Sequence, residues 1–146
     1  MHKNIEKILR GLLIFGGCYF VFDGLLHLSG FKLLSVESWP AAAKAYANLI
    51  NVIYASFVFL ASIFVFIMQK NLKKYKSLIV LSAIWAPCHG LILIFLVWTN
   101  NYQQIFQAFP SLLVWLPIYR EYITINALLL VIYSITVYIW KKKSKY

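Results

Sequence analysis

Asp23 is the one acidic residue of four that lies inside a hydrophobic segment, the run from Gly11 to Leu28. His27 follows it four residues later, so both side chains lie on one face of a helix. A carboxylate in lipid is costly, and intramembrane acids therefore usually face the interior of a bundle and mark a functional site. An acid and an imidazole in this arrangement could transfer a proton, protonate a ligand or simply hold two helices together.

Polar residues also occur in the later apolar segments, and we predict that they share a pocket with Asp23. We expect Asp23 and His89 to be the residues that perform acid/base chemistry. The residues expected to bind the ligand are His27, Asn51, Tyr54, Trp85, Glu121 and Asn126.

Metal binding is an alternative use of the same residues, because Asp23, His27 and His89 could supply three ligands and leave an open position for water. No His-x-x-His or Glu-x-x-His spacing supports it, and di-iron carboxylate bundles need more acids than this chain has. We predict no metal and no cofactor. The cysteines Cys18 and Cys88 lie in apolar segments without a Cys-x-x-Cys motif and are expected to be small buried hydrophobic residues.

The composition indicates that these residues lie in a membrane protein. The chain has 146 residues, of which 62% are hydrophobic, 18% aromatic and only 12% charged. A soluble domain of this size could not bury so much apolar surface. The formal charge is +10, but the basic residues collect at the ends of apolar segments, as membrane anchors do, and nucleic acid is not an expected partner.

The apolar segments predict an all-α integral membrane protein, a single transmembrane bundle of four helices over residues 1–146. The expected spans are residues 9–28, 46–68, 77–98 and 123–140. Ser38 and Pro40 resemble the start of a helix, which places the beginning of the second helix near Ala41. Gly90 is expected to let another helix approach the third span closely. The aromatic connection from Thr99 to Tyr122 predicts an amphipathic interfacial helix or lid between the third and fourth spans.

The basic residues predict the orientation of the four spans. Eleven of the fourteen occur in the N-terminal segment, the connection between the second and third spans, and the C-terminal segment. These are Lys3, Lys7, Arg10, Lys70, Lys73, Lys74, Lys76, Lys141, Lys142, Lys143 and Lys145. The positive-inside rule then places both termini in the cytoplasm. In that topology a rise of about 1.5 Å per residue puts Asp23, Tyr54, His89 and Asn126 at similar depths, roughly 20 Å from the cytoplasmic ends of their helices.

Parts of the sequence resemble two families of membrane proteins. An acid in the first helix, His89 in the third, Glu121 before the fourth and a lysine-rich tail resemble the emopamil-binding and sigma-2-receptor-like group. That resemblance implies a sterol isomerase or a lipid-ligand binder, although the first connection is short and the second helix lacks an acid. The opening ILRGLLIFGG…DGLLHLSGF is similar to DoxX-like proteins, but the second helix does not continue that pattern. Neither resemblance assigns a role to a residue.

These features together predict a multi-pass protein of a bacterial-type inner membrane, or an equivalent membrane, that binds a lipophilic or amphiphilic small ligand. One alternative is a non-catalytic accessory subunit of a membrane complex, whose polar residues lock helices together or contact a partner. A second alternative is a proton-coupled carrier, which would have to be a homo-oligomer because four short helices are too few.

Overall fold

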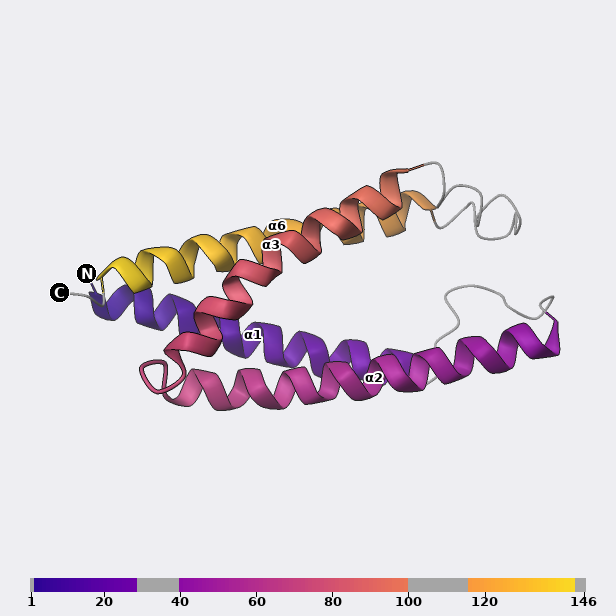
Figure 1. Cartoon of the computed structure of the whole chain (residues 1–146), viewed down its shortest axis with the longest axis horizontal. Helices are drawn as coiled ribbons and strands as arrows, with labels where there is room; N and C mark the ends of the chain where they lie inside the picture. Colours follow the sequence, from indigo (N-terminus) through magenta and orange to yellow (C-terminus); the bar gives the residue numbers. More distant parts are fainter. Residues whose placement is uncertain (1, 29–39, 100–115, 144–146) are drawn as a thin grey trace. The chain divides into compact units, whose positions relative to one another are not determined.

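Four α-helices make up the described part of the chain, which in this computed structural model comprises residues 2–28, 40–99 and 116–143 (Figure 1). The helices are α1 (His2–Leu28), α2 (Ala41–Lys70), α3 (Lys76–Trp98) and α6 (Leu116–Lys143). Their contacts divide the chain into two units. One unit contains Arg10–Lys74 and the other contains Met1–Leu9 with Tyr75–Tyr146, and each unit is described by itself.

All four helices are long and apolar enough to cross a membrane, as the sequence predicts. The shortest, α3, has 23 residues and is therefore about 35 Å long, compared with about 30 Å for the hydrocarbon core of a bilayer. Large apolar side chains such as Phe57, Leu91 and Phe95 are exposed on the helix surfaces. Lipid would cover such a surface, and the described residues thus indicate an integral membrane protein.

Helices α2 and α6 both begin next to a proline. Helix α2 begins at Ala41, immediately after Pro40, whose ψ of 146° is extended. Ser38, the predicted capping residue, lies outside the described residues. Helix α6 begins at Leu116, earlier than the predicted Ile123, and Pro117 lies in its first turn, where the fixed φ of proline suits a helix. Residues 116–122 therefore belong to α6 and not to a separate interfacial segment, and the rest of that predicted segment, residues 100–115, lies outside the described part.

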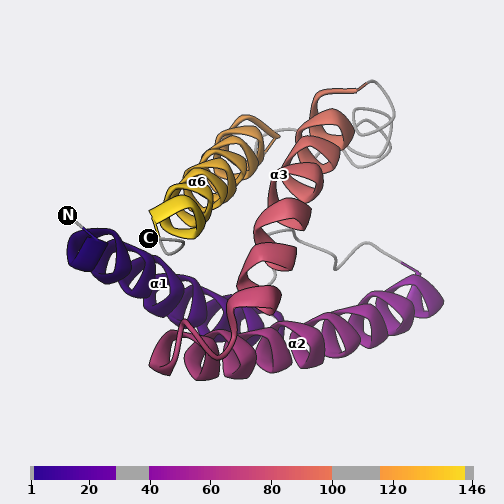
Figure 2. The ribbon, with the colours of Figure 1, turned by 60° about the vertical axis from the view of Figure 1, so that its left-hand side comes forward.

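Helices α1 and α2 run antiparallel and lie side by side in both views (Figures 1 and 2). Gly17 and Gly24 make the close contact possible. A Cβ atom on Gly17 would lie 2.9 Å from the ring of Phe66, and one on Gly24 would lie 2.9 Å from the ring of Phe59. The buried hydroxyl of Ser62 also donates a hydrogen bond of 3.0 Å to the carbonyl of Gly17. Small residues and interhelical hydrogen bonds of this kind hold helices together where lipid removes the hydrophobic driving force.

Arg10 connects the basic end of α1 to the end of α2. Its Nη1 donates hydrogen bonds to the carbonyls of Gln69 and Lys70, the latter at 3.3 Å. The last carbonyls of a helix have no partner within the helix and carry partial negative charge. The guanidinium therefore caps α2 at the point where the chain turns toward α3.

Helices α3 and α6 also run antiparallel, and contacts at three positions along their length join them. Gly90 allows the close approach that the sequence predicts, because a Cβ atom there would lie 3.2 Å from the Cα of Ala127. Nearer the other end, the hydroxyls of Ser82 and Tyr133 are 2.8 Å apart. At that end Lys76 lies over the ring of the fully buried Trp140, 6.0 Å from its centroid.

Candidate functional site

Asp23 is buried in the α1–α2 unit beside three polar residues, and we call the group of Asp23, His27, Asn51 and Tyr54 the Asp23 cluster. Helix α1 contributes Asp23 and His27, which are one turn apart on the same face. Helix α2 contributes Asn51 and Tyr54 from the facing surface. Gly24, next to Asp23, lets the ring of Phe59 come close, so the backbone around the acid is packed against the second helix.

The carboxylate of Asp23 has one strong hydrogen bond. The hydroxyl of Tyr54 donates to Oδ2 at 2.8 Å, and the residue is only 8% exposed. The other oxygen, Oδ1, lies 3.9 Å from Nε2 of His27, which is an ion-pair distance but too long for a hydrogen bond. Among the described residues Oδ1 accepts no hydrogen bond. A carboxylate oxygen without a donor retains an affinity for an added donor or cation.

His27 is held from two sides by α2. Its Nδ1 is 2.9 Å from Oδ1 of Asn51, and its ring centroid lies 4.4 Å from that of Tyr54. Which group donates between Nδ1 and the Asn51 amide depends on the imidazole tautomer, and Nε2 is the nitrogen that faces Asp23. A protonated imidazole would balance the charge of the Asp23 carboxylate. The His27 side chain is 37% exposed and Tyr54 is 42% exposed, so the cluster is open at its surface.

This arrangement can bind or exchange a proton. Asp23 and His27 form a neutral group when they share one proton between them, and such a group is far less costly in lipid than an isolated charge. The same carboxylate can instead pair with a cationic ligand while His27 stays neutral. In the described residues no group of three or more His, Cys, Asp and Glu side chains is close enough to hold a metal ion.

The four other predicted site residues belong to the α3–α6 unit. His89 stacks on Trp85 with ring centroids 4.4 Å apart and an interplanar angle of 14°. Asn126 donates from Nδ2 to the carbonyl of Tyr122 at 2.9 Å, a bond within its own helix. Glu121 is exposed and lines a pocket at the start of α6. The pairing of Asp23 with His89 would join the two units and stays a prediction.

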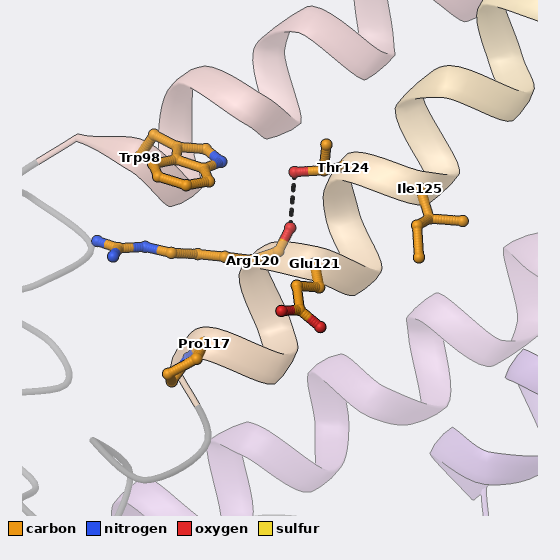
Figure 3. A pocket seen from close by; sticks show the side chains of 6 residues that line it. All are labelled: Trp98, Pro117, Arg120, Glu121, Thr124 and Ile125. Atoms are coloured by element: carbon orange, nitrogen blue, oxygen red, sulfur yellow. Dashed lines mark hydrogen bonds between the residues drawn. The ribbon is translucent and has the colours of Figure 1, made fainter.

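The pocket beside Glu121 includes polar residues that sequence reasoning did not place in a site. It is lined by Trp98, Pro117, Arg120, Glu121, Thr124 and Ile125 (Figure 3). In the sequence Arg120 lies outside the three basic segments, and Trp98 ends the third predicted span. The position of Arg120 at the end of an apolar segment could have indicated this pocket, because an isolated charge there needs a partner.

No family model matches this sequence, and no similarity was found to a curated protein or to a solved structure. The resemblances to the emopamil-binding group and to DoxX-like proteins therefore rest only on the residues quoted for them. Function has to be argued from the Asp23 cluster and the pocket themselves.

Proposed function

We propose that this chain is a multi-pass membrane protein that binds a small lipophilic or amphiphilic ligand at the Asp23 cluster. The ligand that suits the cluster best is a lipophilic amine, whose ammonium group supplies both a positive charge and hydrogen-bond donors. Asp23 acts as the anionic partner, and Tyr54 holds the carboxylate in position through its hydroxyl. In this proposal His89 takes part as a second acid/base group.

The observation that supports this proposal is the unsatisfied Oδ1 of Asp23. Tyr54 occupies only Oδ2, at 2.8 Å, and His27 lies 3.9 Å from Oδ1. A group that donates a hydrogen bond to Oδ1 would complete the partners of the carboxylate. Because His27 and Tyr54 are both partly exposed, a lipophilic molecule in the bilayer can approach from the side of the helices.

The proposed topology places both termini in the cytoplasm. It is supported by the basic residues at the start of α1, between α2 and α3, and at the end of α6. The Asp23 cluster then lies in the outer half of the bilayer, roughly 20 Å along α1 from Arg10.

A non-catalytic accessory subunit is the second candidate, and one observation favours it. The hydrogen bond between Tyr54 and Asp23 and the contact between His27 and Asn51 both join α1 to α2. Polar contacts between transmembrane helices often have only this structural role. The two candidates differ in what happens when the charge on Asp23 is removed.

The test uses Asp23→Asn, His27→Gln and His89→Gln in the full chain in detergent. Thermal stability is measured together with binding of N,N-dimethyldodecylamine, and dodecanol serves as the uncharged probe of equal chain length. We expect Asp23→Asn to remain folded, since interhelical hydrogen bonds in membranes average about 0.6 kcal/mol. Amine binding should weaken about tenfold, which corresponds to about 1.4 kcal/mol, while dodecanol binding should change little.

The matched control is Ser56→Ala, because the Ser56 hydroxyl bonds only to the carbonyl of Val52 in its own helix. It should alter neither stability nor amine binding. Unchanged amine binding together with a lower melting temperature in Asp23→Asn and His89→Gln would reject the ligand site and favour the accessory subunit.

A further inference from the structure

The pocket at the start of α6 has a volume of about 450 Å³, within the range of about 300–1,000 Å³ found for small-molecule sites. The described residues that line it belong to the α3–α6 unit, and none of these belongs to the Asp23 cluster. Most of the lining surface is apolar, with Trp98, Pro117 and Ile125 among its residues. The charged members are Arg120 and Glu121.

Arg120 stacks on Trp98, and its Nε has no hydrogen-bond acceptor among the described residues. Its guanidinium lies over the ring of Trp98, with its central carbon 4.9 Å from the ring centroid. Figure 3 shows the side chain extended beneath that ring. The Nε atom is buried, and within the described residues it has no hydrogen-bond partner. An oxygen anion is the natural partner of such a group, because the guanidinium presents paired donors in a geometry that matches phosphate and carboxylate.

Glu121 adds a negative charge to the lining of the same pocket. In Figure 3 its carboxylate points away from the guanidinium of Arg120, to another side of the helix start. A simple anion that approaches Arg120 is attracted by the guanidinium but repelled by the negative carboxylate of the neighbouring Glu121. A zwitterion avoids this repulsion, because its negative group can contact Arg120 while its positive group contacts Glu121.

We propose that this pocket binds an amphiphile whose head group combines a phosphate with a primary ammonium, as in phosphatidylethanolamine. Arg120 binds the phosphate through its guanidinium, and Glu121 binds the ammonium. The apolar walls contact the start of the acyl chains. The position of the pocket fits this occupant, since it lies where α6 begins, at the opposite end of that helix from Lys141, Lys142 and Lys143.

The experiment measures dissociation constants by native mass spectrometry for the full chain in a neutral detergent. The probes are phosphatidylethanolamine, phosphatidylglycerol, which has the same phosphate without the ammonium, and free phosphoethanolamine. The unaltered protein should bind phosphatidylethanolamine at least tenfold more tightly than phosphatidylglycerol. Free phosphoethanolamine should bind much more weakly than the lipid, and equal affinity would overturn the assignment of an amphiphile.

Three variants assign the roles of the two charges. Arg120→Gln should weaken phosphatidylethanolamine binding about tenfold or more. Glu121→Gln should weaken phosphatidylethanolamine and strengthen phosphatidylglycerol, which reverses the preference. Lys142→Gln, an exposed base at the other end of α6, is the control and should leave phosphatidylethanolamine binding unchanged.

The proposal is overturned if Arg120→Gln binds phosphatidylethanolamine as tightly as the unaltered chain, or if Glu121→Gln keeps the original preference. If Arg120→Gln does not fold, Arg120→Lys replaces it. That variant keeps the charge but loses Nε and the planar fork, so it should bind several-fold more weakly. Unchanged affinity in Arg120→Lys would overturn the role of the guanidinium.

Discussion

At the scale of single residues, the bond from Tyr54 to Asp23 is the contact with the clearest consequence. Tyr54 donates to Oδ2 of Asp23 at 2.8 Å, and Asp23 is buried. Removing the phenolic hydroxyl leaves both oxygens of the carboxylate without a hydrogen bond from the described residues. A buried acceptor that has lost its donor raises the free energy of the folded state.

Tyr54→Phe should therefore lower the free energy of unfolding by about 0.6 kcal/mol, and by at most about 1.7 kcal/mol, the range found for hydrogen bonds between membrane helices. Unfolding in mixed micelles measures this change. In a double-mutant cycle the effect should largely vanish when Asp23 is already replaced by Ala, because each change then removes the same hydrogen bond.

The control for this experiment is Tyr138→Phe. Tyr138 is 68% exposed on α6, so loss of its hydroxyl should cost little. An equal loss of stability in Tyr138→Phe would show that tyrosine hydroxyls matter for another reason. Additive effects of Tyr54→Phe and Asp23→Ala would contradict the contact itself.

At the scale of helix pairs, glycine positions decide how closely the helices approach. A Cβ on Gly90 would meet the Cα and Cβ of Ala127 at 3.2 Å, and backbone atoms cannot move aside as a flexible side chain can. By contrast, Gly16 has no other atom within 4 Å of the place where its Cβ would be. Both glycines lie inside helices, but only Gly16 has room for a Cβ atom.

We expect Gly90→Ala to separate α3 from α6 and to destabilise the protein by about 1–3 kcal/mol, the usual cost of overpacking. Gly16→Ala should be neutral or stabilising by up to about 1 kcal/mol, since alanine favours a helix over glycine. Melting temperatures of the two variants in detergent provide the comparison.

A second substitution tests whether the effect at Gly90 comes from contact with α6. Ala127→Gly removes the Cβ that lies 3.2 Å from the added methyl group, so it should restore part of the stability lost in Gly90→Ala. If Gly90→Ala is as stable as Gly16→Ala, the close approach of α3 and α6 is not needed for stability.

At the scale of the whole molecule, the proposed topology can be tested by labelling single cysteines. Cys18 and Cys88 are both exposed, contrary to the expectation that they are buried, and must first be replaced by alanine. Cysteines at Lys73 and Lys143 should then react only with reagent on the cytoplasmic side, and a cysteine at Gln104 only with reagent outside. Reaction at position 104 from the cytoplasm would contradict the orientation with both termini inside.

Much of the helical structure follows from the sequence because helix formation in lipid is local. A backbone without water must satisfy its hydrogen bonds within the segment, so an apolar run of sufficient length becomes a helix whatever surrounds it. The four spans were predicted on this basis, whereas the start of α2 near Ala41 was predicted from Ser38 and Pro40. The shared face of Asp23 and His27 likewise depends only on the period of one helix.

The partners of Asp23 were decided by the tertiary structure. The sequence offered His27 or His89 as the partner of Asp23, and within the α1–α2 unit the described contacts of Asp23 are with Tyr54 and His27. Pairing with His89 stays a prediction. The contact of Asn51 with His27 and the pocket around Arg120 also depend on how each helix is rotated about its axis and aligned with its neighbour. Apolar residues surround α3 on nearly every side, so periodicity does not show which face meets another helix. In lipid that choice depends on close packing and a few polar contacts, which only the assembled helices reveal.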